Sequence, residues 1–158
     1  MAHEELKRKL LSSDRPPIHL RVTGGPPRQR FDLDLRIEGD GTIVSRLHDD
    51  LERRETSKRV KLEHARLEPI YAEIARSGLL DTDAKAAPFI PDSLIGVIEI
   101  EGNRWLFYAD REQAEAADAR APEGILAATR QLMQVAASAL NLPSISPTLV
   151  GDPQSDRI

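Results

Sequence analysis

The chain has 158 residues, with 22 Lys and Arg against 26 Asp and Glu, and a net charge of −4. This length is typical of one domain. The absence of cysteine excludes a disulfide framework, a thiolate metal site and a cysteine nucleophile, and the negative charge argues against a dedicated nucleic-acid binder.

The sequence contains no apolar run of about 18 residues, the length that predicts a membrane span. Residues 1–8 also lack the apolar region of a secretory signal. We therefore expect a cytoplasmic protein without a membrane contact. The absence of cysteine fits a reducing compartment.

The net charge is unevenly distributed along the chain. Residues 1–66 hold 15 Lys and Arg against 12 Asp and Glu, which gives +3, whereas residues 67–158 hold 7 against 14, which gives −7. One interpretation is a solvated surface with uneven charge. The other is a folded domain with a basic face and an acidic face, one of which meets a partner.

Residues 1–17 are predicted to form a flexible N-terminal arm. Leu6, Leu10 and Leu11 would share one side of a short helix, but Pro16 and Pro17 disfavour helical geometry just before them. We expect a single α+β domain over residues 18–142. Residues 143–158 contain three prolines and no periodicity, which predicts a disordered C-terminal tail.

Alternating apolar and polar residues predict strands. The predicted strands are 18–22, 31–37, 42–47, 57–62, 94–101 and 104–109. The alternation is clearest over 31–37, where Phe31 begins an apolar face and Asp32 a polar one. The Asp-Gly pair within residues 38–41 predicts a hairpin turn. Gly102-Asn103 is predicted to be a second, two-residue hairpin connection.

Helical spacing predicts two helices. Apolar residues recur on one helix face at Leu67, Ile70, Tyr71 and Ile74. The first helix is expected over 68–77, with Pro69 in its first turn and Gly78 at its end. The second is expected over 122–140, and residues 110–120 are either helical or a solvated loop. The predicted fold is α+β, with an antiparallel sheet of about five to six strands and two helices packed on one face.

No catalytic, cofactor-binding or metal-binding residue is assigned from the sequence. His48 and Asp50 could share a metal ion, but they supply only half of a site. The serines show no nucleophile elbow. The carboxylate pairs Asp32/Asp34, Asp81/Asp83 and Glu99/Glu101 could support acid–base chemistry or form the wet side of a strand.

Nucleic-acid binding is not expected, because the basic residues between Arg46 and Arg66 alternate with acidic ones and lack an aromatic partner for base stacking.

The proline-stiffened loop after the first strand is the candidate for partner binding, because preorganisation lowers the entropy cost of docking. Its candidate residues are Gly24, Gly25, Pro26, Pro27, Arg28 and Arg30. Three aromatic residues are expected either to anchor an interface or to pack in the core. They are Tyr71, Trp105 and Tyr108.

Several of these pieces occur together in a known family. They are Gly24-Gly25 after the first strand, the helical region 67–80, Pro91-Asp92 before strand 94–101, and the region 122–140. In this order, over residues 18–140, the chain resembles the emfourin-type inhibitors of thermolysin-like metalloproteases. Pro26-Pro27 stand where that family has small and aromatic residues. The resemblance implies a non-enzymatic protein that blocks a protease through its loops.

We therefore expect a non-enzymatic protein-interaction module, with a protease inhibitor acting through its hairpin loops as one form of it. A small enzyme that uses carboxylates or His48 is one alternative, and it requires a pocket with a titratable group. A carrier that holds a small ligand between sheet and helices is the other. The sequence names neither the partner nor the oligomeric state.

Overall fold

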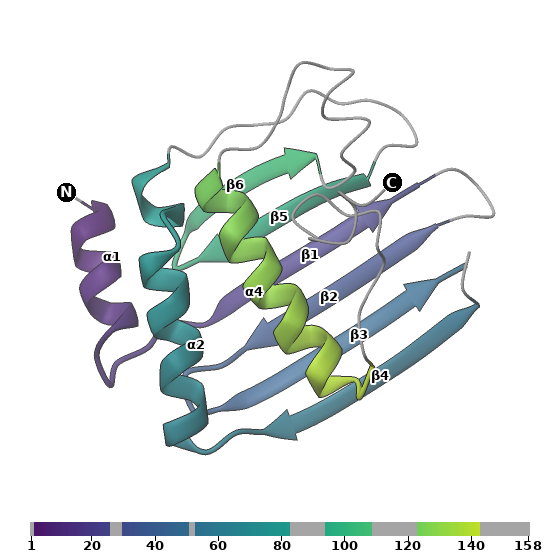
Figure 1. Ribbon diagram of the computed structural model, residues 1–158, viewed down its shortest axis with the longest axis horizontal. Helices are drawn as coiled ribbons and strands as arrows, with labels where there is room; N and C mark the ends of the chain where they lie inside the picture. The colour runs from purple at the N-terminus through teal and green to yellow at the C-terminus, as the bar shows by residue number, and fades with distance from the viewer. Residues whose placement is uncertain (1, 26–29, 51–52, 83–93, 109–122, 143–158) are drawn as a thin grey trace.

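Six strands pair into one antiparallel sheet in the computed structural model, which describes residues 2–25, 30–50, 53–82, 94–108 and 123–142. The strands are β1 (Ile18–Gly24), β2 (Phe31–Ile37), β3 (Thr42–Asp49), β4 (Arg54–Lys61), β5 (Leu94–Ile100) and β6 (Asn103–Tyr108). Their order across the sheet is β4-β3-β2-β1-β5-β6 (Figure 1). The predicted α+β class and strand number are confirmed.

The central strand β1 pairs along its whole length with β2 and with β5. Its apolar residues Ile18, Leu20 and Val22 are buried on one side of the sheet, and the residues between them are not. The same alternation runs through β2 from Phe31 to Ile37, as predicted. This period of two directs one apolar row of each strand into the core.

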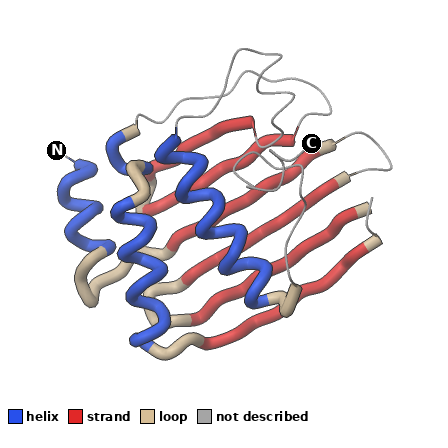
Figure 2. The backbone as a smooth tube through the Cα atoms, in the orientation of Figure 1, coloured by secondary structure: helices blue, strands red, loops and turns tan. Residues whose placement is uncertain are grey.

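All described helices pack on the same side of the sheet. They are α1 (Ala2–Leu10), α2 (His64–Arg76), the short 3₁₀ helix η1 (Leu79–Asp81) and α4 (Glu123–Ala139). Figure 2 shows α4 across the sheet, α2 near the end of the strands and α1 beside α2. The described residues therefore contain one α-helix more than predicted. No helix within these ranges combines the length and apolar character needed to cross a membrane.

The two predicted hairpin turns have different outcomes. The turn at residues 38–41 is confirmed, and the Gly41 N–H donates to the Glu38 carbonyl at 3.0 Å. The second connection is Glu101-Gly102, because Ile100 pairs with Asn103, so the predicted Gly102-Asn103 is shifted by one residue. Glu101 and Gly102 have φ of 48° and 84°. Positive φ at both loop residues is what a type I′ hairpin requires.

Helix α2 begins four residues earlier than predicted, at His64, and Pro69 lies inside it rather than in its first turn. A proline there removes one helical hydrogen bond, which the burial of Leu67 and Tyr71 against the sheet offsets. Gly78 follows the helix with φ of 91°, which confirms the predicted end.

The predicted flexible arm is wrong for residues 2–10, because they form α1. Leu6 and Leu10 are 3% and 1% exposed and belong to the same core as the sheet residues. The prolines after the helix therefore end it without preventing it, and burial of the two leucines stabilises it. The packed region begins before residue 18, whereas the predicted tail over 143–158 lies outside the described residues.

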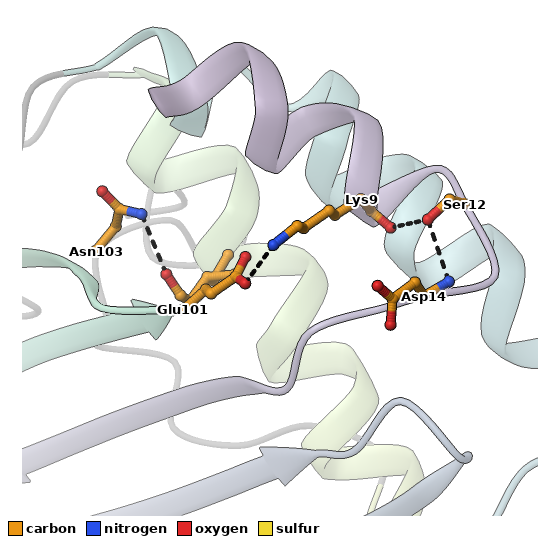
Figure 3. Close-up of polar contacts among 6 residues, drawn as sticks. Lys9, Ser12, Asp14, Glu101 and Asn103 are labelled. Carbon is orange, nitrogen blue, oxygen red and sulfur yellow. Dashed lines mark hydrogen bonds and ion pairs between the residues drawn. The ribbon is translucent and has the colours of Figure 1, made fainter. Parts of the chain in front are cut away.

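An ion pair holds α1 against the β5–β6 hairpin (Figure 3). The Lys9 Nζ atom donates to Glu101 Oε1 at 2.6 Å, and this hydrogen bond raises the pKa of the Lys9 ammonium group. Both side chains are partly exposed. The pair therefore orients the helix, while the buried leucines supply most of the stabilisation.

We predict that Leu10→Ala lowers the free energy of unfolding by about 2–5 kcal/mol, because it leaves a cavity in the core. The adjacent Leu11 is 57% exposed and provides a matched control. Leu11→Ala should change the stability by less than about 0.5 kcal/mol. Urea unfolding of both variants measures the difference, and equal effects would show that α1 is not part of the core.

Candidate interaction surface

The sheet face opposite the helices is covered by no described element, and we call it the open face. Its residues are His19, Arg21 and Thr23 on β1, Asp32, Asp34 and Arg36 on β2, Val44, Arg46 and His48 on β3, Glu55, Ser57, Arg59 and Lys61 on β4, Ile95, Val97 and Glu99 on β5, and Arg104 and Leu106 on β6. Each is half-buried or exposed. The open face therefore presents a broad, mostly charged surface.

The centre of the open face is a network of ion pairs between β1 and β2. The His19 Nε2 atom lies 3.0 Å from Asp34 Oδ1, and the Arg36 Nε atom lies 3.6 Å from the same oxygen. The Arg21 Nε atom lies 3.9 Å from Asp32 Oδ1. Asp32 and Asp34 share a face, as the sequence predicted. Asp34 contacts His19 and Arg36, and Asp32 contacts Arg21.

His48 contacts two carboxylates through opposite sides of its ring. Its Nε2 atom lies 2.6 Å from Asp50 Oδ1, and its Nδ1 atom lies 3.8 Å from Glu55 Oε2. The predicted proximity of His48 and Asp50 is confirmed. The three groups do not converge on one point, and no cluster of three or more metal-ligating side chains occurs among the described residues. Metal sites need three or four converging ligands.

The histidines of the open face do not complete a catalytic triad. Within the described residues, the polar contacts of His19 and His48 are to carboxylates and include no serine or threonine hydroxyl. Ser57 pairs with Arg46 across the β3–β4 ladder, two residues along from the pair formed by Glu55 and His48. A triad needs a nucleophile hydrogen-bonded to the base, and neither of these two histidines has one among the described residues.

The β5–β6 side of the open face is less charged. Arg104 contacts Glu99 Oε1 through Nε at 2.9 Å and through Nη2 at 2.8 Å. Beside this pair lie the half-buried apolar side chains Ile95, Val97 and Leu106. These apolar side chains make this end of the open face less polar than the ion-pair network on β1 and β2.

The predicted binding loop lies at one end of the sheet, and the structure describes only part of it. Gly24 is the last residue of β1 and pairs with Phe31 and Leu94. Gly25 follows it, and Arg30 is exposed, with its carbonyl accepting the Asp50 N–H at 3.0 Å. Pro26, Pro27 and Arg28 lie outside the described residues. The loop therefore ends at Arg30 beside Asp50, the residue that contacts His48.

Two of the three aromatic residues considered as interface anchors lie in the core. Tyr71 and Trp105 are fully buried. The Tyr71 hydroxyl donates to the Pro16 carbonyl at 2.8 Å, and the Trp105 indole N–H donates to the Thr82 carbonyl at 3.0 Å. Burial raises the pKa of the Tyr71 hydroxyl. The side chain of Tyr108 lies outside the described part of the structure.

Sequence reasoning found the polar rows of this surface but not the contacts between strands. Alternation placed Arg21 on the wet side of β1 and Arg36 beside Asp34 on β2, but only the register shows that Arg21 lies beside Asp32. The pairing of β1 with β5 places Glu99 next to His19, although the two are 80 positions apart in the chain. No local pattern in the sequence carries that information.

Comparisons with protein-family models and with curated proteins returned no match to this chain. The likeness to emfourin-type inhibitors therefore stays a prediction made from the sequence.

The β2–β3 turn carries a carboxylate whose ionised form is stabilised by the fold. The Thr42 N–H donates to Asp40 Oδ1 at 2.9 Å, and this bond lowers the pKa of the Asp40 carboxyl below its usual 3.8. Lys61 at the end of β4 lies 3.7 Å from Asp40 Oδ2 and acts in the same direction. The turn and the end of β4 are therefore linked electrostatically.

We predict that Asp40 makes stability depend on pH in the acid range. Because its pKa is lowered in the folded state, its contribution is complete above pH 3.8 and is lost as the pH falls through the lowered value. Asp40→Asn keeps an oxygen acceptor for Thr42 but removes the charge. Urea unfolding across this range should show that the advantage of the parent chain over Asp40→Asn shrinks at low pH. A difference that does not vary with pH would contradict the assignment.

Proposed function

We propose that this chain is a non-enzymatic protein-interaction module that binds a protein partner through the open face. The observation that carries the proposal is the one-sided fold, in which every described helix packs on the same face of a six-stranded sheet (Figure 2). Antiparallel sheets tolerate a solvated face. In this sheet that face is an ordered network of charges rather than a scatter of small polar residues.

The ion pairs around Asp34 support the proposal because they fix side chains before a partner arrives. His19 and Arg36 both contact Asp34, and the neighbouring Arg21 faces Asp32. Side chains that are already held lose less conformational entropy on binding. Charged groups at fixed positions also select a partner of complementary charge pattern.

A protease is the partner that the sequence resemblance suggests. In this form of the proposal, the loop that begins at Gly24 and Gly25 and ends at Arg30 contacts the protease, with the open face beside it as a second contact. The loop leaves and re-enters the sheet between two paired strands, so its ends are held by the β1–β2 ladder.

We predict that removing charge from the centre of the open face weakens capture of the partner about tenfold or more, a change that corresponds to about 1.4 kcal/mol. The test variant is Arg21→Ala with Arg36→Ala. The matched control is Arg66→Ala with Arg76→Ala, which removes the same charge from exposed positions on α2. Crosslinking in extracts of the producing cells, followed by mass spectrometry, identifies the captured proteins.

A protein captured by the parent chain and by the α2 control, but not by the open-face variant, would support the proposal. Equal capture by all three proteins would contradict it. Unfolding curves of both double variants show whether each is folded during the experiment.

A further inference from the structure

Strand β4 is an edge of the sheet, and half of its backbone groups point away from β3. The Leu62 N–H donates to the Gly41 carbonyl at 2.9 Å, which makes these two residues a hydrogen-bonded pair of the ladder. In an antiparallel ladder such pairs alternate with pairs that do not bond to each other. The N–H and C=O groups of Glu55, Ser57, Arg59 and Lys61 therefore point outward.

The neighbouring ladder supports this assignment independently. The Glu38 N–H donates to the Thr42 carbonyl, and the Asp50 N–H donates to the Arg30 carbonyl. Even-numbered residues of β3 thus bond to β2, which leaves its odd-numbered residues to bond to β4. Among the described elements, only β3 pairs with β4. The outer edge of β4 can accept another strand.

The side chains along this edge are strongly basic. Residues 54–61 contain four basic residues and one acidic residue, Glu55. Arg59 and Lys61 lie on the open face and Lys58 on the other, and all three are exposed. Neither Lys58 nor Arg59 has a carboxylate within 4.0 Å in the part of the chain that the structure describes. Arg46, which pairs with Ser57 on β3, has none there either.

We propose that β4 binds an extended acidic segment of a partner protein, which adds to the sheet as a seventh strand. This inference rests on the proposed interaction function and names the edge and the chemistry of the partner. The outward N–H and C=O groups supply the main-chain hydrogen bonds of strand addition. Acidic side chains on the added strand pair with Arg59 and Lys61 on the open face and with Lys58 on the other.

The same charges disfavour a second copy of β4 as the occupant. Antiparallel pairing of two copies would bring together two strands that each carry four basic residues and one acidic residue, and like charges on opposed strands are destabilising. Basic residues on an edge strand are one way in which proteins prevent such self-pairing. An acidic strand turns this repulsion into attraction, so the edge selects its partner by charge.

The outward backbone favours a peptide over a nucleic acid. A phosphate chain could pair with Arg59 and Lys61, but it has no N–H donors for the outward carbonyls of β4. No aromatic residue occurs within β4 to stack a base. A single-stranded DNA oligonucleotide is therefore included as a competitor in the test.

The binding test uses the full chain and a fluorescent peptide of alternating valine and glutamate, equal in length to β4. We expect this peptide to bind at least tenfold more tightly than a valine–lysine peptide of the same length. The acidic peptide can also be methylated on the alternate backbone nitrogens that face β4. This methylation should weaken its binding about tenfold, because it removes the N–H donors but keeps the charge. Fluorescence anisotropy measures all three affinities.

Variants of the chain separate the charge of β4 from its backbone. Arg59→Glu with Lys61→Glu should weaken binding of the acidic peptide about tenfold or more, whereas Arg66→Glu with Arg76→Glu on α2 should change it less than about twofold. Ser57→Pro removes one outward N–H without touching the β3 ladder. It should weaken binding of the acidic peptide without changing the overall charge.

Equal binding of the methylated and unmethylated peptides would overturn strand addition. The proposal would also be overturned if the oligonucleotide bound more tightly than the acidic peptide, or if the β4 and α2 charge reversals had equal effects. None of these results affects capture of a partner that depends on Arg21 and Arg36. A failure at β4 is therefore distinguishable from a failure of the proposed function.

The unfolding curve of each variant shows whether it is folded. If Ser57→Pro does not fold, the charge-reversal pair and the methylated peptide still decide the question.

Discussion

The pairing of β1 with both β2 and β5 joins the two halves of the chain into one sheet. Each residue from Ile18 to Gly24 has a partner on either side, although three strands and the helices α2 and η1 lie between β1 and β5 in the chain. A shift of one residue in either ladder would exchange the buried and exposed rows of β1. The burial of Ile18, Leu20 and Val22 therefore disfavours such a shift in the two ladders of β1.

This register also determines the open face. Once the apolar row of β1 faces the helices, His19 and Arg21 must face the other side, where β2 presents Asp34 and Asp32 at adjacent positions. The ion pairs of the open face follow from core packing, because the same alternation positions both rows. The order of these charged residues across the sheet is therefore set by the same register as the core.

The features that could be predicted from the sequence are those that depend on neighbouring residues. Alternation over 31–37 and the Asp-Gly turn after it need only local information, and both are present in the structure. The docking of α1 could not be deduced in this way, because Leu6 and Leu10 are stabilised by contacts with distant parts of the core. The contact between His19 and Asp34 likewise depends on the register of two strands separated by a loop.

The two edges of the sheet differ in how their charges are used, and this difference decides which edge can recruit a partner. On β6 the one charged residue, Arg104, makes two contacts with Glu99 of β5, so its charge is neutralised within the sheet. On β4, Arg54 contacts Asp49 and Lys61 contacts Asp40, but the cations between them have no such partners among the described residues. Electrostatic attraction acts on unneutralised charge. An acidic segment that approaches the sheet is therefore drawn to β4, where the outward backbone can bind it.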